Sequence, residues 1–450
     1  MYAADALTSQ GSVPVSVDIL DRLPCPFGLV RYGVAPDHLS IRSVRQTLEK
    51  FFDRPGVRFL GNVEVGRDIT VAELHRYYDA IVFTYGAARD RRLGIEGEEL
   101  AGSIAATALV AWYCGHPDAP RELIESSLQG ASSVVIVGVG NVAVDVTRVL
   151  AKTRAELEHT DMPEHVLALL DASNITDIHL LGRRGPVQAT FTTKELRELG
   201  ELDDAEVIVD SADLVLDPFS EAALAQDRVA ARNLDVLREW STRTPRGSRR
   251  RVHVRFLTRP VELLGTALVE KVVVERTRLD ETGAAIGTGE LETIGADLVV
   301  RSVGYRGEPL AELPFDSRRG VVPNDAGRVL RDDAVVPGEY VAGWIKRGPT
   351  GIIGTNKKDA AQTVNSLLED AERLPLAVEP AHDAVTTMLC ARGIEVVTFD
   401  GWERIDAAEI ALGVSAGRVR TTMHERDALL GVALGERHSP RPDAGDPPIR

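Results

Sequence analysis

A glycine-rich turn between an apolar strand and a helix is the clearest chemical signal in this sequence. Residues 132–150, SSVVIVGVGNVAVDVTRVL, place Gly138, Gly140 and Ala143 in the spacing G-x-G-x-x-A. The first glycine allows a tight turn, the second lets the backbone approach a pyrophosphate, and the small third residue lets the helix pack against the strand. Free N–H groups at the start of the helix favour an anion. The spacing predicts a dinucleotide-binding turn, with a ligand-free strand–helix turn as the alternative.

The following strand indicates which dinucleotide would bind. The predicted strand 178–182, IHLLG, ends in Arg183 and Arg184. An acidic residue at this position would bind the ribose 2'-hydroxyl of NAD, whereas arginine accommodates the 2'-phosphate of NADP. Two guanidinium groups can hold one phosphate through charge-assisted hydrogen bonds. We therefore expect NADP(H) at this site, with a solvated basic turn as the alternative.

A second half-site, acidic rather than basic, is expected near the start of the chain. Residues 15–20 form a predicted buried strand that ends in Asp21, where an acid could bind a ribose hydroxyl. Residues 2–10 before it have the small and apolar side chains of a packed helix. In a doubly wound domain such a helix follows a strand and a glycine-rich loop, and neither precedes it here.

Composition limits the classes of protein that fit. The 450 residues suffice for two or three domains, and the net charge of −16 disfavours nucleic acid as a partner. No long apolar run and no signal-peptide pattern are present, so we expect a cytoplasmic protein without a membrane span. Cys25, Cys114 and Cys390 form no C-x-x-C pair, which disfavours dithiol chemistry and an iron–sulfur cluster of the chain's own. No spacing predicts a metal site.

Apolar strand-like runs alternate with helical stretches, which predicts an α/β fold with parallel sheets. The predicted strands are 15–20, 80–85, 134–137, 178–181, 298–303 and 340–344. We expect two nucleotide-binding, Rossmann-like domains, the second inserted in a discontinuous first. The expected ranges are 1–130 for the first part of the first domain, 131–297 for the inserted domain, 298–437 for the remainder and 438–450 for a loose tail.

Five segments carry a resemblance to the adrenodoxin-reductase-type NADPH-ferredoxin reductases: 23–38, 135–150, 180–199, 298–307 and 340–360. The resemblance implies an FAD-dependent oxidoreductase in which the NADP(H) domain is inserted in the FAD domain. NADPH would give hydride to FAD, and single electrons would pass to a ferredoxin-type iron–sulfur protein. Two alternatives are an NADP(H)-binding protein without flavin and a donor like the glutamate synthase small subunit. The latter is disfavoured because no cysteine-rich region is present.

The resemblance also implies which residues form the site. The FAD contacts would be Asp21, Leu29, Val65, Trp344, Gly351, Ile352 and Ile353. The NADP(H) contacts would be Arg91, Gly138, Gly140, Asn141, Val142, Arg183, Arg184, Glu195 and Gly351. His38, Asp145 and Glu198 fall where the family has polar groups near the reacting rings, and a histidine beside two acids can relay a proton or set the local charge. A purely structural His38 is the alternative.

The family begins with a strand and a G-x-G-P-x-G loop that holds the FAD pyrophosphate, and this sequence aligns just beyond that loop. Either the translated start lies upstream, or the protein lacks the loop and binds FAD poorly. We expect the former, because a parallel sheet that loses a central strand would expose apolar edges.

A run of arginines could receive the electron-accepting partner. Arginines concentrate between residues 243 and 256 of this acidic protein, namely Arg243, Arg246, Arg249, Arg250 and Arg251. Ferredoxins are generally acidic, and complementary charge mainly raises the encounter rate. We expect docking near this run, with a solvated loop beside a strand as the alternative.

Overall fold

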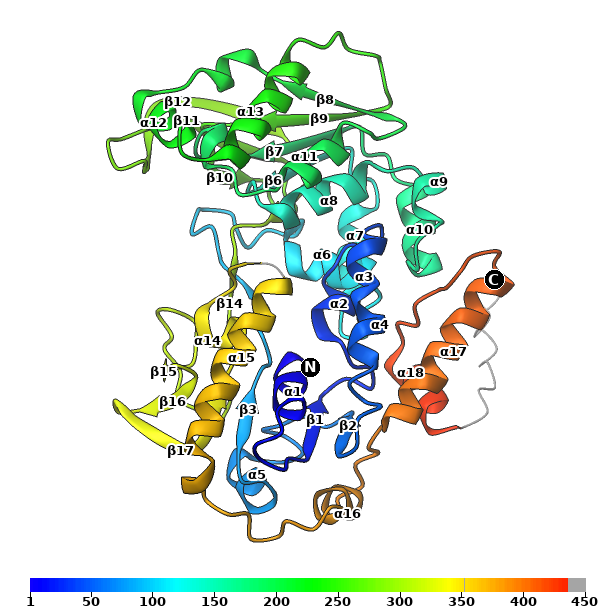
Figure 1. Cartoon of the computed structure of the whole chain (residues 1–450). Coiled ribbons are helices and arrows are strands. Elements are labelled where there is room, and N and C mark those ends of the chain that lie inside the picture. The colour runs from blue at the N-terminus through cyan, green and yellow to red at the C-terminus, as the bar shows by residue number, and fades with distance from the viewer. Residues whose placement is uncertain (352, 436–450) are drawn as a thin grey trace.

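The structure is a computed structural model that describes residues 1–351 and 353–435. The predicted loose tail 438–450 and the predicted FAD contact Ile352 lie outside these residues. Figure 1 shows an upper and a lower α/β part, with a pair of C-terminal helices at the side. Among the described helices, none combines the length and the apolar character needed to span a membrane.

The lower part is built from the two ends of the chain. Its elements are α1 (Tyr2–Ser9), β1 (Val17–Asp21), α2 (Gly28–Tyr32), α3 (Leu39–Arg42), α4 (Val44–Glu49), β2 (Val57–Gly61), α5 (Val71–Tyr77), β3 (Ile81–Phe83), β15 (Asn324–Asp325), β16 (Arg328–Arg331), β17 (Ala334–Val341), α14 (Trp344–Arg347), α15 (Ile353–Asp370) and the 3-10 helix η3 (Ala371–Arg373). The C-terminal helices are α16 (Ala384–Ala391), α17 (Phe399–Ser415) and α18 (Arg426–Leu434).

Two parallel strand pairs form the centre of the lower part. β1 pairs with β2, and β3 pairs with β17, which continues antiparallel into β16 and β15. β1 and β3 do not pair with each other in the described residues. The predicted N-terminal helix is present as α1, whose Ala3 and Leu7 pack with Val364 and Leu367 of α15. One apolar cluster thus joins the beginning of the chain to its later return.

The upper part contains the middle of the chain. Its elements are β5 (Ser103–Ala105), α6 (Ala106–Tyr113), α7 (Arg121–Leu128), β6 (Ser133–Val137), α8 (Asn141–Ala151), α9 (Arg154–Leu157), α10 (Glu164–Asp171), β7 (Asp177–Leu181), η1 (Pro186–Gln188), α11 (Thr193–Leu199), β8 (Ala205–Val209), η2 (Ser211–Leu214), α12 (Pro218–Leu224), α13 (Arg228–Ser241), β9 (Arg250–Arg255), β10 (Thr258–Leu264), β11 (Lys271–Leu279), β12 (Ala285–Gly295) and β13 (Leu298–Arg301).

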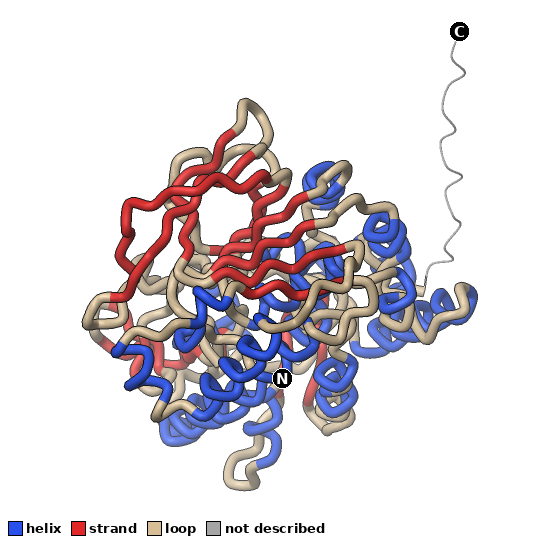
Figure 2. The backbone as a smooth tube through the Cα atoms, turned by 90° about the horizontal axis from the view of Figure 1, so that it is seen from above, coloured by secondary structure: helices blue, strands red, loops and turns tan. Residues whose placement is uncertain are grey.

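A six-stranded parallel sheet in the order β5-β13-β6-β7-β9-β8 is the core of the upper part, and Figure 2 looks down on it. Side chains alternate between its faces, as the pleat requires. Val134 and Ile136 of β6 pack in the helix-covered core, whereas Val135 and Val137 face the three-stranded sheet β10-β11-β12. The predicted α/β class with two Rossmann-like parts is confirmed.

The sheet of the upper part takes strands from outside the predicted range 131–297. β13, which begins at residue 298, lies between β5 and β6 and pairs in parallel with both. The chain crosses between the two parts at a short antiparallel ribbon of β4 (Arg89–Asp90) and β14 (Tyr305–Arg306). Strand spacing along the sequence does not reveal this pairing, because the partners lie far apart in the chain. The division into 1–130, 131–297 and 298–437 stays a prediction.

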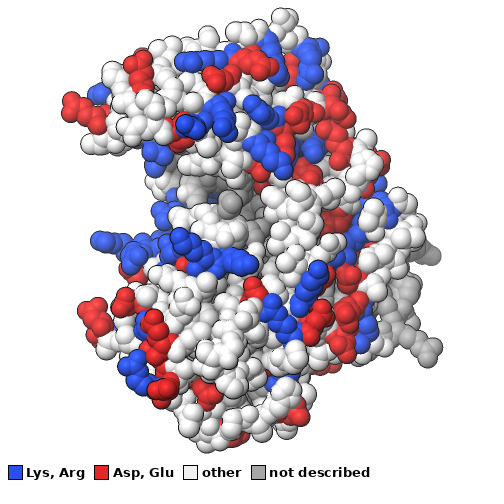
Figure 3. Space-filling view, in the orientation of Figure 1, with Lys and Arg blue, Asp and Glu red and all other residues white. Residues whose placement is uncertain are grey.

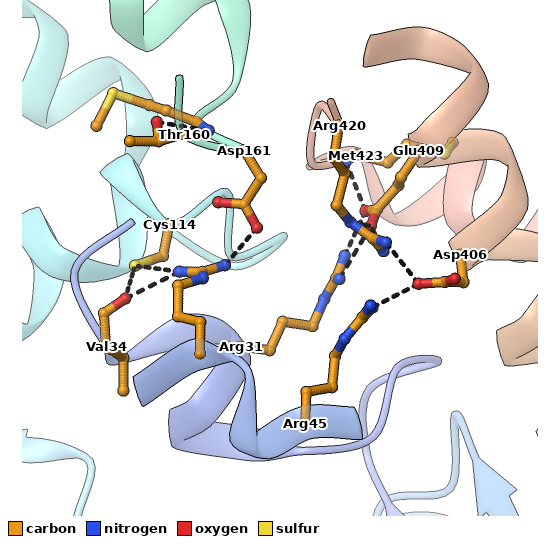
Figure 4. A network of polar contacts seen from close by, with 12 residues as sticks. Arg31, Val34, Arg45, Cys114, Thr160, Asp161, Asp406, Glu409, Arg420 and Met423 are labelled. Atoms are coloured by element: carbon orange, nitrogen blue, oxygen red, sulfur yellow. Dashed lines mark hydrogen bonds and ion pairs between the residues drawn. The ribbon is translucent and has the colours of Figure 1, made fainter. Parts of the chain in front are cut away.

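A buried ionic cluster fastens α17 to the lower part (Figure 4). The side chain of Glu409 is fully buried and accepts hydrogen bonds from Arg31 of α2, from Arg420 at 3.0 Å and from the Met423 N–H at 2.8 Å. Asp406, one turn earlier, accepts from Arg420 and from Arg45 of α4. The guanidinium of Arg31 is itself only 3% exposed, so it depends on Glu409 for its countercharge.

Replacing Glu409 is therefore expected to destabilise the protein strongly. Glu409→Gln keeps the shape of the side chain but leaves Arg31 as a buried, uncompensated cation. Breaking one partner of a buried ion pair costs about 3–5 kcal/mol. Urea unfolding followed by tryptophan fluorescence measures the change, because the ring of Trp402 contacts Arg31, Arg45 and Arg420. Glu403→Gln is the matched control, because Glu403 is exposed on the same helix. Equal unfolding midpoints for the two variants would contradict the assignment.

Candidate active site

The glycine-rich turn has the geometry that its spacing predicts. Gly138 has φ +130°, and a Cβ atom there would lie 2.1 Å from the Ser302 carbonyl oxygen, so only glycine fits. Its N–H donates to the Leu181 carbonyl at 2.9 Å, which ties the turn to the end of β7. α8 starts directly after Gly140, and no side chain of the described residues caps it. The first N–H groups of this eleven-residue helix are therefore available to an anion.

The two predicted phosphate-binding arginines lie beside this turn. The Arg183 carbonyl accepts a hydrogen bond from Thr277, and the Arg184 carbonyl accepts one from the Leu257 N–H. Their backbone is thereby fixed, while neither guanidinium has a hydrogen bond or ion pair with any residue that the structure describes. Arg183 is exposed and Arg184 is half-buried. Two uncommitted cations next to a glycine-rich turn are suited to hold a phosphate.

A cluster of charged side chains surrounds His38, which precedes α3. The Nε2 atom of His38 lies 2.9 Å from Asp145 of α8, 3.0 Å from Glu195 of α11 and 3.9 Å from Glu198 of α11. The structure thus brings together the three residues proposed to act at the rings, His38, Asp145 and Glu198, with one predicted NADP(H) contact. Their roles stay predictions.

Arg148, which the sequence did not single out, lies at the centre of this cluster. Its side chain is 1% exposed and binds Asp37 in a fork, Nε to Oδ2 at 2.7 Å and Nη2 to Oδ1 at 3.0 Å. It also contacts Asp145 at 3.0 Å, Glu198 at 3.3 Å and the ring of His38. The only sequence feature that pointed to Arg148 is its i,i+3 spacing from Asp145, which allows an ion pair on one helix face. The same spacing is common on solvent-exposed helices, so it does not indicate a buried cluster.

The surroundings of His38 favour its protonated form. Burial alone lowers the pKa of His38, but hydrogen bonds to Asp145 and Glu195 outweigh it and raise the pKa to about 9. Burial raises the pKa of Glu195, yet the hydrogen bond with His38 outweighs it, so the net pKa is lowered. An imidazolium can donate a proton but cannot bind a metal ion, because both of its nitrogens carry hydrogen. The cluster is therefore suited to holding a proton at a buried ring.

The predicted FAD contacts gather at the carboxyl end of β1 and around α14. Asp21 ends β1 and accepts a hydrogen bond from the Leu23 N–H at 2.9 Å, while burial raises its pKa to about 6. Trp344 begins α14 and stacks on Tyr305, with ring centroids 5.9 Å apart and planes 14° apart. The indole Nε1 of Trp344 is buried without a partner among the described residues, so a bound group with an acceptor would satisfy it.

The other predicted contacts are distributed around the same two parts. Leu29 of α2 is exposed, and Val65 packs partly buried in the lower part. Arg91 follows β4, where its N–H donates to the Gly304 carbonyl and its Nε to the carbonyl of Tyr305, the stacking partner of Trp344.

Asn141 begins α8 and accepts a hydrogen bond from the Thr192 N–H, and Val142 follows it and packs against the core. Gly351 has φ +82°, and Ile353 begins α15.

The loop before Gly351 is held in place by a buried lysine. Gly343 has φ +77°, and its N–H donates to Asp359 of α15. Lys346 of α14 is 7% exposed and lies 3.1 Å from the same carboxylate. The turn that carries Trp344 is thus fixed from both ends of α14.

The arginine run 243–251 lies far from the glycine-rich turn. β9 begins at Arg250, whereas the turn and Arg183 are at the carboxyl ends of the parallel strands. Arg250 is 2% exposed and donates to the carbonyls of Ala151 and Lys152 at the end of α8. Its inclusion in a docking surface is wrong, because the strand buries it beneath α8. Arg251 is exposed, but Asp177 engages its guanidinium in a fork.

Other basic side chains border the space between the two parts. Figure 3 shows a recess between the upper and lower parts, with Lys and Arg side chains gathered along its lower border. β14 of the β4–β14 ribbon lies between the two parts in Figure 1. Arg89 is exposed in β4, and the exposed Arg318 accepts a hydrogen bond from Arg306 of β14 at its carbonyl.

Comparison with known proteins identifies the family. The chain is 46% identical over 434 residues to the NADPH-ferredoxin reductase FprA of Mycobacterium tuberculosis, covering 94% of this chain and 93% of that protein. It is 39% identical over 441 residues to the mitochondrial NADPH:adrenodoxin oxidoreductase of Homo sapiens, covering 92% and 86%. The chain belongs to the adrenodoxin-reductase-type NADPH-ferredoxin reductases. No family model matches it.

A solved structure of the same family superimposes closely. The structure of M. tuberculosis FprA in complex with NADPH has a TM-score of 0.90 and 43% identity, covering 96% of this chain and 97% of that one. The family resemblance carried by the segments 23–38, 135–150, 180–199, 298–307 and 340–360 is thereby confirmed.

The charge on His38 leads to a pH-dependent contribution to stability. Because its folded pKa of about 9 exceeds the ordinary value of 6.5, the stabilisation is complete below about pH 6.5 and disappears as pH rises through 9. His38→Gln should therefore flatten the fall in urea midpoint between pH 6.5 and 9. His159→Gln, at an exposed histidine, is the control and should follow the wild type. Parallel pH profiles for the wild type and His38→Gln would refute the inferred protonation.

Proposed function

We propose that this chain is an NADPH-dependent reductase of a ferredoxin-type iron–sulfur protein and uses FAD. The observation that carries the proposal is the pair of uncommitted guanidinium groups, Arg183 and Arg184, beside a glycine-rich turn in a chain of this reductase family. FAD, when bound, supplies the change from two-electron hydride chemistry to one-electron transfer. The reductase names of the relatives favour this function over an NADP(H)-binding protein without flavin and over a glutamate-synthase-like donor.

The upper part would hold the nicotinamide dinucleotide. The start of α8 after Gly140 offers N–H groups to the pyrophosphate. Arg183 and Arg184 offer positive charge to the 2'-phosphate, which NADH lacks. The site should therefore distinguish NADPH from NADH by the 2'-phosphate, because the nicotinamide ring and the pyrophosphate are the same in both.

The lower part would hold the flavin dinucleotide. Asp21 offers a carboxylate to a ribose hydroxyl, and Trp344 offers a buried indole N–H to an acceptor. Arg91, placed on Tyr305 at the ribbon, would lie between the two cofactor sites. The His38 cluster holds a proton on the imidazole ring and so balances negative charge nearby. A cytoplasmic location stays part of the prediction.

The basic border of the recess is the better candidate for docking the iron–sulfur partner. Four members of the predicted run are exposed and lie near the amino end of β9: Arg243, Arg246, Arg249 and Arg251. Arg89 and Arg318 instead lie by the ribbon that carries Tyr305, the stacking partner of Trp344. Electrons leave from the flavin side of the molecule, so a partner seated at the ribbon is closer to their source.

Loss of the two guanidinium groups should weaken NADPH binding selectively. Each charge-assisted phosphate contact contributes about 1.5–3 kcal/mol. Arg183→Gln/Arg184→Gln should therefore raise the KM for NADPH at least about 10- to 100-fold, while the KM for NADH is unchanged. The assay supplies FAD and an acidic ferredoxin and follows ferredoxin-dependent cytochrome c reduction. A protein that binds NADPH but passes no electrons when FAD is supplied would instead favour the binding protein without flavin.

Charge reversal distinguishes the two docking surfaces. We expect Arg89→Glu/Arg318→Glu to lower the ferredoxin-dependent rate at low salt by about tenfold or more, and to flatten its salt dependence. NADPH-dependent reduction of ferricyanide, which needs no protein docking, should be unchanged. Arg243→Glu/Arg246→Glu is the matched variant and should behave like the wild type. The opposite pattern would place docking at the predicted run.

A further inference from the structure

Two histidines and an aspartate from separate segments meet on one face of the upper sheet. His179 of β7 is paired in register with His253 of β9, and Asp177 lies two residues before His179 on the same side of the strand. The Nε2 atom of His253 lies 2.9 Å from Asp177, and the two imidazole rings lie 4.5 Å apart at 13°. One ligand atom from each of the three residues falls within 4.8 Å of the others.

The three candidate ligand residues are partly buried, and one of their ring nitrogens has no hydrogen-bond partner among the described residues. The three residues are half-buried on the face opposite the helices α8 and α13. The Nδ1 atom of His179 is buried and has no hydrogen-bond partner among the described residues. A neutral imidazole nitrogen without a hydrogen-bond partner can offer its lone pair to a metal ion.

A competing cation lies beside the cluster. Arg251 forks onto the Asp177 carboxylate, with Nε 2.8 Å from Oδ1. Arg255, two residues after His253 in β9, pairs with Glu292 of β12. A metal ion bound here would therefore share Asp177 with Arg251 or displace it. Arg251 would thus weaken metal binding, and replacing it should raise the affinity of the site for the metal ion.

We propose that Asp177, His179 and His253 form a binding site for a divalent transition-metal ion, with Zn²⁺ as the preferred ion. Two imidazole nitrogens and one carboxylate oxygen are ligands that Zn²⁺ accepts, and three protein ligands leave a fourth position for water. The ion would join β7 to β9. The site lies on the face of the sheet away from α8, so it is separate from the dinucleotide turn and the His38 cluster.

Calorimetric titration of the chelator-treated full-length chain with ZnCl₂ tests the proposal. We expect one site per chain, which His179→Gln and His253→Gln each weaken at least tenfold. Arg251→Gln should tighten binding several-fold, because it frees the Asp177 carboxylate. A merely structural ion pair would not produce a gain in metal affinity. Far-ultraviolet circular dichroism confirms that each variant is folded.

A second histidine pair supplies the control. His165 and His424 have ring centroids 4.2 Å apart, with Glu125 3.7 Å from His165 and Glu425 3.2 Å from His424. Among the described residues, however, no three ligand atoms there lie within 4.8 Å of one another. His165→Gln should leave zinc affinity unchanged. Three results would overturn the proposal. The wild type could lack a stoichiometric site, zinc binding could survive in both His179→Gln and His253→Gln, or binding could be lost in His165→Gln.

Discussion

The buried guanidinium of Arg148 joins the upper and lower parts of the molecule beside His38. It extends from α8 of the upper part and binds Asp37, which belongs to the segment before α3 of the lower part. A fully buried cation is costly unless its donors are paired, and here four carboxylates and one imidazole surround it. The surplus of acids over Arg148 and Lys152 keeps a proton on His38, so the position and charge of His38 follow from one interaction.

Local features were predictable because their chemistry lies within a few consecutive residues. Gly138, Gly140 and the pair Arg183–Arg184 each follow a strand, and the strand–turn–helix order alone places them at the carboxyl edge of a parallel sheet. Asp145 and Glu198 were placed near His38 only through family resemblance, since no spacing connects residue 38 to residue 145. No feature of the neighbouring sequence indicates that the segments carrying His38, Asp145 and Glu198 come together in the fold.

Non-local features were not predictable. Arg148 and Glu409 each occupy a helix on which charged residues ordinarily face solvent, and only the packing of a second segment buries them. Arg250 was misjudged for the same reason, because a run of arginines suggests exposure while strand alternation turns one of them inward. The meeting of His179 and His253 depends on β9 lying between β7 and β8, an order that the sequence does not state.

The segment from α2 to α4 is held from three directions, and this explains how a short, loop-rich stretch can position His38. Arg31 is fixed by Glu409 of α17, Arg42 pairs with Asp161 of the upper part, and Asp37 is fixed by Arg148. Figure 4 shows Arg31 directed toward Glu409. Because α3 and α4 are only four and six residues long, their own hydrogen bonds could not define the segment. The C-terminal helices therefore help to position the segment that carries His38 through Arg31, although no residue of α17 or α18 belongs to the predicted cofactor contacts.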